Sequence, residues 1–239
     1  MKRQNIILHT WAIYIDHWWP LVLSAGIFLV PLAIISFLLA DRAGFYVAKV
    51  VLPFMRCLVS FFYMALATFY FIDGDDVANI DILRGLGKLR GVFMKVALAG
   101  SIIGIITACG FIILIVPGIV FTVWFYMAIP AMVDGRTGII NGLKTSKNLG
   151  RGYFFNILLV AIVIVTIVGP MSIFFHRILP RVFINIFTIE NKDTIMILTK
   201  GLSTFGGVVL TPLASIPPVL LYRKLKKKQA LLTAPHLEH

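Results

Sequence analysis

Long apolar segments dominate this sequence and restrict what the chain can fold into. At least five of them approach the roughly 20 apolar residues that a helix needs to cross a hydrocarbon core about 30 Å thick. Runs such as 112–116 are continuously apolar, whereas the strands of a membrane barrel alternate in polarity. The composition agrees, since 59% of the residues are hydrophobic and 13% charged, against about 45–50% and 25% in soluble domains. The sequence therefore predicts an all-α integral membrane protein.

Six transmembrane helices are expected within a single membrane domain, residues 1–236, and 237–239 are interpreted as the remnant of an affinity tag. The spans are predicted at about 20–40, 50–72, 95–116, 117–133, 154–176 and 203–222. A cleaved signal peptide is not expected, because the first apolar run is long and has no convincing cleavage site.

The very short connection at Pro117 and Gly118 predicts a tight hairpin between the third and fourth spans. Proline cannot continue the preceding hydrogen-bond ladder, and glycine permits a chain reversal. Whether these two spans cross the membrane fully or form a shorter re-entrant pair is left open.

The distribution of basic residues predicts the orientation. Of 22 Lys and Arg residues, 15 fall on one side of the predicted spans, 6 on the other, and Arg56 lies within a span. The positive-inside rule then places both termini in the cytoplasm of an inner-membrane protein. Because the basic residues of this chain, net charge +12, are scattered between apolar runs, they favour topology and anionic lipid over nucleic acid.

Three segments on the predicted inner side have apolar residues at helical spacing: the N-terminal stretch to Trp18, 79–93 and 136–152. Each precedes two spans, so we expect three helical hairpins, each introduced by an interfacial amphipathic helix, as a weak threefold repeat. Their basic residues are the predicted lipid or anion contacts: Arg84, Lys88, Lys144, Lys147 and Arg151. The outer segment 177–202 is expected to be a half-buried interfacial helix or hairpin.

Arg56 is the main candidate for chemistry inside the membrane. A charge there is costly, about 2.5 kcal/mol or more at the bilayer centre, which suggests an anchor for a phosphate or carboxylate headgroup. The alternative is that Arg56 lies near the outer end of its helix and snorkels to the interface. Gly100 and Gly104, with Ala108, form a small-residue stripe suited to close helix packing, within the chain or with a second copy.

No catalytic or metal-binding motif is recognised. Zinc-helix, Walker-loop and nucleophile-elbow patterns are missing from the sequence. The acidic cluster at Asp73, Asp75, Asp76 and Asp81 matches no calcium loop, and its place before a helix favours capping. We therefore expect no enzyme activity, cofactor or metal.

One stretch resembles a known family. Val116-Pro117-Gly118 opens a span, Asp134 ends it, and an amphipathic helix follows that carries Gly142, Leu143, Ser146 and Leu149. This pattern resembles the glycerophosphoryl diester phosphodiesterase membrane-domain family and a related bacterial inner-membrane family of unassigned function. The segment 221–225 is similar to the family's basic, tyrosine-containing exit from its last helix. The resemblance implies a six-helix inner-membrane protein linked to envelope upkeep, without the family's catalytic barrel.

The motif residues also have structural interpretations. Asp134 is expected to cap the positive end of the following helix, and the Ser146 hydroxyl to bond across to another helix.

At the level of function, we expect a non-enzymatic inner-membrane protein that binds or organises lipid or another amphiphile in envelope homeostasis. Its expected partners are membrane lipids, and homo-oligomerisation and a protein partner are left open. One alternative is a transporter or channel for a small anion or hydrophobic solute. Another is a scaffold that docks a cytoplasmic partner.

Overall fold

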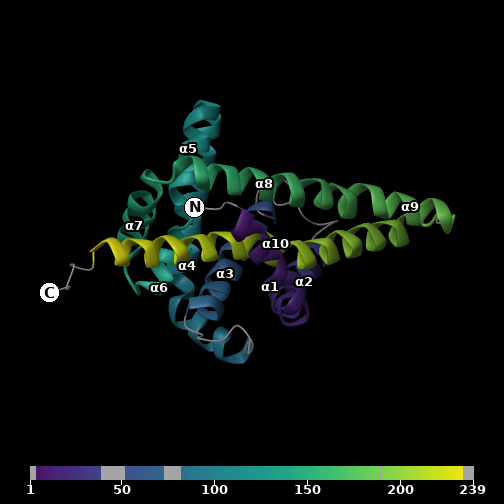
Figure 1. The fold of residues 1–239 in the computed structure, drawn as a ribbon. Coiled ribbons are helices and arrows are strands. Elements are labelled where there is room, and N and C mark those ends of the chain that lie inside the picture. The colour runs from purple at the N-terminus through teal and green to yellow at the C-terminus, as the bar shows by residue number, and fades with distance from the viewer. Residues whose placement is uncertain (1–3, 39–51, 73–81, 189, 234–239) are drawn as a thin grey trace.

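The computed structural model describes residues 4–38, 52–72, 82–188 and 190–233, and all regular elements in these ranges are helices (Figure 1). Six of its helical stretches are long and apolar enough to cross a membrane: Trp18–Ile35, Phe54–Phe71, Ile82–Ile113, Ile115–Asp134, Phe154–Ile186 and Asp193–Gln229. The prediction of an all-α multi-pass membrane protein with six such helices is confirmed.

The first half of the chain forms α1 (Gln4–Asp16), α2 (Trp18–Leu38), α3 (Leu52–Ile72), α4 (Ile82–Ile113) and α5 (Ile115–Phe125). The second half forms α6 (Ala128–Asp134), α7 (Ile139–Arg151), α8 (Phe154–Ile173), a π-helical turn (Phe174–Ile178), α9 (Leu179–Ile186) and α10 (Lys192–Thr233). The predicted acidic cluster at 73–81 and the tag remnant lie outside the described residues.

The hairpin between α4 and α5 turns at Leu114, not at Pro117 and Gly118 as predicted. Leu114 is extended, with φ −158° and ψ 147°, and Pro117 is the third residue of α5, where its missing N–H leaves no intrahelical bond unmade. Gly118 allows α4 and α5 to approach each other closely. A Cβ on Gly118 would lie 2.5 Å from the Phe111 ring, and one on Gly110 would lie 3.0 Å from the Gly118 Cα.

The expected separate amphipathic helix at 79–93 is also wrong in form. Its described part is the first third of α4, which runs unbroken through 32 residues, a length of about 48 Å. This exceeds the roughly 30 Å hydrocarbon core, so α4 is long enough to carry its basic first turns beyond the apolar layer. The second unit of the expected repeat therefore differs from the others.

The predicted fourth span is broken in the middle. α5 ends at Phe125 and α6 begins at Ala128, with Met127 out of the helical region at φ −106°, ψ 12°. Pro130 explains the break, because a proline ring clashes with the carbonyl four residues earlier, here that of Tyr126. α6 is consequently short and buried over most of its length.

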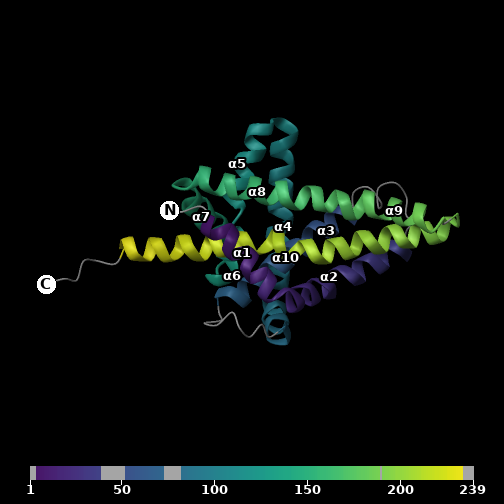
Figure 2. The ribbon, with the colours of Figure 1, turned by 45° about the vertical axis from the view of Figure 1, so that its right-hand side comes forward.

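The predicted outer segment 177–202 forms the tip of a long helical hairpin. The π-helical turn and α9 continue α8 outward, and α10 returns over 42 residues, about 63 Å. Thr188, in the connection, takes a left-handed φ of 48°. Figures 1 and 2 show α8 and α10 running along each other, with the α4–α5 hairpin lying across them.

Three apolar clusters hold the helices together. One joins α1, α2, α3 and α10 around Tyr63, Phe71 and Ile216. The second joins α3, α4 and α6 around Val96 and Ile129. The third joins α5, α6, α7, α8 and α10 around Val123, Ile157 and Leu221. α10 thus touches most of the other elements and organises the fold.

The N-terminal helix α1 packs across α10 (Figure 2). Ile13 is buried there and the Tyr14 hydroxyl donates to the Val209 carbonyl at 3.0 Å. Burial raises the pKa of the Tyr14 phenol, which keeps it a protonated donor. The indoles of Trp11 and Trp18 are exposed, as expected of aromatic side chains near a membrane interface.

Large apolar side chains are exposed at the tip of the α4–α5 hairpin, where residues 112–116 are 63–83% exposed. A water-soluble protein does not present an apolar surface of this kind without a partner. The surface is consistent with contact to lipid chains.

Candidate functional site

A basic cavity of about 280 Å³ lies where the end of α3, the first turns of α4 and the end of α6 meet. It is lined by Phe69, Lys88, Val92, Lys95, Met132, Val133, Arg136 and Thr137. Three of these eight side chains are cationic and none is acidic. The cavity therefore combines positive charge with apolar walls.

Polar groups of α4 and of the turn after α6 line the cavity. The Lys88 ammonium lies 5.9 Å from the centre of the Phe69 ring, so the chain of α4 holds one cation over an aromatic wall of α3. After α6, the Thr137 hydroxyl is buried and has no hydrogen-bond partner among the described residues. A buried polar group without a partner costs free energy unless a ligand or water satisfies it.

Arg136 reaches the cavity because the chain turns sharply after α6. Its backbone φ of 47° lies in the left-handed region, and its N–H bonds the Val133 carbonyl at 3.3 Å. A left-handed non-glycine residue costs roughly 1 kcal/mol or more and persists only where its surroundings hold it. The turn between α6 and α7 thus places a cation against the first turns of α4.

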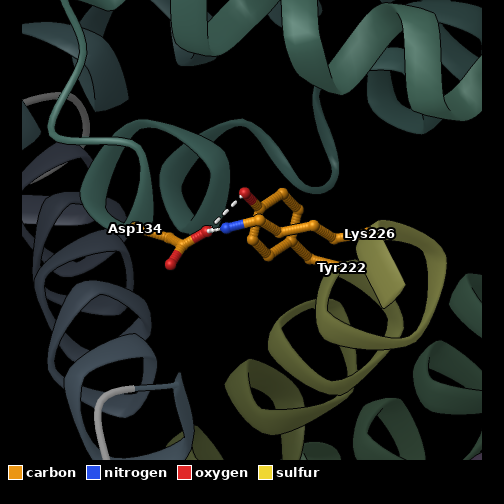
Figure 3. Close-up of polar contacts among 3 residues, drawn as sticks. All are labelled: Asp134, Tyr222 and Lys226. Carbon is orange, nitrogen blue, oxygen red and sulfur yellow. Dashed lines mark hydrogen bonds and ion pairs between the residues drawn. The ribbon is translucent and has the colours of Figure 1, made fainter. Parts of the chain in front are cut away.

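Asp134, immediately before this turn, is bound by two side chains of α10 (Figure 3). Its Oδ2 atom accepts a hydrogen bond of 2.7 Å from the Tyr222 hydroxyl and forms an ion pair with the Lys226 ammonium. The predicted capping of α7 by Asp134 is wrong: the N-cap residue is Gly138, and no side chain caps this helix. The carboxylate is instead neutralised by Lys226.

Ser146 behaves as predicted. Its buried hydroxyl donates to the Trp124 carbonyl of α5 at 2.6 Å. The last carbonyls of a helix have no partner within the helix, and Trp124 is in the last turn of α5, just before the break at Met127. The amphipathic helix α7 therefore completes the end of the broken span, and Gly142 lets it approach Met132 of α6 closely.

The other basic residues singled out from the sequence lie apart from the basic cavity. Lys144 and Arg151 are exposed on α7, and Lys147 lies over the Trp124 ring, 4.5 Å from its centre. Arg84 is exposed in the first turn of α4. Of the predicted lipid or anion contacts on α4 and α7, only Lys88 lines this cavity.

Arg56 lines a second, smaller cavity of about 140 Å³ between α2, α3 and α10. This cavity is lined by Leu29, Leu32, Ala33, Arg56, Ser60, Ser203, Thr204, Gly207 and Thr211. Arg56 stands near the beginning of α3 and Phe69 near its end, so the two cavities are separated by about 13 residues of helix, roughly 20 Å.

The small-residue stripe on α4 is used only in part. A Cβ on Gly100 would lie 2.6 Å from the Phe61 ring, so Gly100 allows α3 to approach α4. Nothing in the described structure lies within 4 Å of the corresponding point on Gly104. The expected packing role of Gly104 is therefore not met within the described part of this chain.

No family model, curated protein or solved structure matches this chain. The resemblance to the phosphodiesterase membrane-domain family accordingly stays a prediction. What the structure adds is that Asp134 and Tyr222, from the two separate parts of the chain that carry the resemblance, are in direct contact.

Lys95, Arg136 and Thr137 were not singled out from the sequence as ligand contacts. In the sequence, Lys95 and Arg136 count only among the basic residues of the predicted inner side. Their convergence on one cavity depends on the packing of α4 against α6. Thr137 carries no sequence signal at all. The left-handed backbone at position 136 could not be predicted either, because the residue there is not glycine, the residue that most readily adopts this conformation.

Proposed function

We propose that this protein binds the headgroup of an anionic lipid or similar amphiphile in the basic cavity. The observation that carries the proposal is the convergence of Lys88, Lys95 and Arg136 on a cavity whose other walls are mainly apolar. Basic pockets between membrane helices bind anionic lipid headgroups in this way. The unsatisfied Thr137 hydroxyl supplies a further hydrogen-bonding group.

The location of the cavity supports a headgroup over a soluble anion. Arg136 follows the end of α6, and Lys226, in the C-terminal part of α10, forms an ion pair with Asp134, the last residue of α6. Such a concentration of cations at one end of the bundle is what the positive-inside rule expects of a cytoplasmic face. With this orientation both termini are cytoplasmic, and the protein is a multi-pass protein of the inner membrane that acts in envelope homeostasis without catalysing a reaction.

Native mass spectrometry of the purified protein with phosphatidylglycerol and phosphatidylcholine of matched chains tests the proposal. We expect phosphatidylglycerol to bind more tightly, and Lys88→Gln/Lys95→Gln to lower its affinity by roughly 25-fold, since each cation near an anionic lipid is worth about 1 kcal/mol, or fivefold. The double variant Lys144→Gln/Arg151→Gln removes the same charge from α7, outside the cavity. Equal loss in both double variants would show charge attraction without a site and contradict the proposal.

The transporter and scaffold alternatives stay predictions. The two cavities share no lining residue, so no specific observation favours a continuous path for a solute. Ion or solute flux in proteoliposomes that disappears in Lys88→Gln/Lys95→Gln would replace the lipid-binding proposal with transport.

A further inference from the structure

The second cavity, the one lined by Arg56, has a pattern of donors and acceptors different from that of the basic cavity. Arg56 is its one charged lining residue, and in the described structure no acidic side chain pairs with it. The guanidinium offers up to five N–H donors and no acceptor. A phosphate group satisfies such a fork with two parallel hydrogen bonds.

Three hydroxyl groups in the same cavity are restricted to accepting. Thr204 donates its proton to the Lys200 carbonyl at 2.8 Å, and Thr211 donates to the Gly207 carbonyl at 2.7 Å. Ser60 donates to the Arg56 carbonyl at 3.3 Å. Because a hydroxyl has one proton and two lone pairs, each of these oxygens can still accept a hydrogen bond but has no proton left to give. Ser203 is likewise engaged, with the His176 ring.

A ligand matched to this wall must carry two kinds of group. It needs an anionic group for Arg56 and, a few ångströms away, N–H or O–H donors for the hydroxyl oxygens. A bare phosphate or carboxylate offers no such donors when fully ionised. A phosphoethanolamine group offers both, since its phosphate accepts and its ammonium donates three hydrogen bonds.

The size and surroundings of the cavity point to the headgroup of a lipid. Its volume of about 140 Å³ holds about five water-sized groups at roughly 30 Å³ each, enough for a headgroup fragment but not for acyl chains. Apolar side chains beside it are exposed, among them Ile34 on α2 and Phe54 and Met55 on α3. Acyl chains attached to a headgroup in the cavity can lie along these surfaces.

We propose that the Arg56 cavity is a binding site for the headgroup of a phosphatidylethanolamine-type lipid. The phosphate contacts the Arg56 guanidinium, and the amine donates to hydroxyl oxygens within its reach, either Thr204 or Thr211 and not both, because these two lie two turns apart on α10, about 10 Å. The site lies at the opposite end of α3 from the basic cavity, and it does not depend on the function proposed for that cavity.

The test compares phosphatidylethanolamine with phosphatidylcholine of the same acyl chains, by native mass spectrometry of the purified full-length protein. The choline headgroup has the same phosphate but no N–H donor. Wild-type protein is expected to prefer the ethanolamine lipid by roughly tenfold, the effect of about one net hydrogen bond. Arg56→Gln is expected to weaken the binding of both lipids, whereas Thr204→Val/Thr211→Val is expected to remove the preference alone.

Matched controls are available in the same chain. Thr166 also donates to a carbonyl of its own helix, that of Ile162 at 2.8 Å, but does not line the cavity, so Thr166→Val should keep the preference. Arg181→Gln removes an exposed cation from α9 and should leave both affinities unchanged. An unchanged unfolding temperature shows that a variant is folded.

Three results would overturn the proposal: equal binding of the two lipids by the wild-type protein, unchanged affinities in Arg56→Gln, or a preference that survives in the double threonine variant. Water-soluble glycerophosphoethanolamine distinguishes a lipid from a free ligand. If it binds as tightly as the lipid, the acyl chains contribute nothing and the assignment to a lipid is wrong.

Discussion

The Tyr222 hydroxyl donates a hydrogen bond of 2.7 Å to Asp134 Oδ2, and so joins the C-terminal part of α10 to the end of α6 (Figure 3). Lys226, one turn further along α10, forms an ion pair with the same oxygen. The Asp134 side chain is only 9% exposed, whereas that of Lys226 is 57% exposed. The two contacts should therefore differ in strength although they share an acceptor.

We expect Tyr222→Phe to destabilise the protein more than Lys226→Gln. A hydrogen bond to a charged group contributes about 1.5–3 kcal/mol, and its removal leaves a nearly buried carboxylate with one partner fewer. An ion pair with an exposed lysine contributes about 0–1 kcal/mol. Unfolding of the two variants in detergent measures the difference. A larger loss in Lys226→Gln would mean that the ion pair, rather than the tyrosine, holds α6 to α10.

The Ser146 hydroxyl gives a second prediction. Ser146→Ala removes the only bond found in the described structure between a side chain of α7 and the Trp124 carbonyl, at a position that is fully buried. We expect a loss of about 1–2 kcal/mol, the range for polar contacts between helices in membranes. Ser101→Ala is the matched control, because Ser101 donates to the Ala97 carbonyl of its own helix and its loss should be nearly neutral. Equal effects would show that α7 does not depend on this bond.

The sequence predicted the features that depend on local composition. The six apolar helices and the amphipathic α7 were found because hydrophobicity and its helical period are properties of contiguous residues. The cross-helix bond of Ser146 followed from its position on the apolar face of α7. Pro130 also carries a local signal for the break in the fourth span, since a proline inside an apolar run can interrupt a helix.

What the sequence did not predict depends on residues that are distant along the chain. Asp134 was assigned to the cap of α7, which is the local option, while its partner Tyr222 lies 88 residues away. Lys95 and Arg136 line the same cavity only because α6 packs against α4. The periodicity of apolar residues along the sequence does not predict which helices pack together. The turn at Leu114 was placed three residues late, because proline and glycine were expected to end a helix, whereas here they begin one.

Gly100 and Gly104 provide a third prediction, within one helix. A Cβ at Gly100 would meet Phe61 at 2.6 Å, so Gly100→Ala should overpack the α3–α4 contact at a cost of about 1–3 kcal/mol. Gly104 faces open space, so Gly104→Ala should stabilise α4 by up to about 1 kcal/mol through its higher helix propensity. Unfolding in detergent checks both. If Gly104→Ala destabilises the protein and also shifts its size in detergent, Gly104 faces a second copy of the chain.

The proposed orientation makes the fourth prediction, which is tested by cysteine accessibility. Lys144, on α7, and Glu190, between α9 and α10, are both exposed and lie on either side of the long α8–α9 stretch. In a variant without Cys57 and Cys109, Lys144→Cys and Glu190→Cys each provide one reporter. If the basic end of the bundle is cytoplasmic, a membrane-impermeant maleimide added to spheroplasts labels Glu190→Cys at once.

Lys144→Cys should then react only after the membrane is permeabilised. Because each variant carries the same thiol at an exposed position, labelling of both in permeabilised spheroplasts controls for intrinsic reactivity. The reversed pattern would place the basic cavity on the outer face, where the attraction to cytoplasmic anionic lipid does not operate. Labelling of both residues from outside would show that the α8–α9 stretch does not cross the membrane.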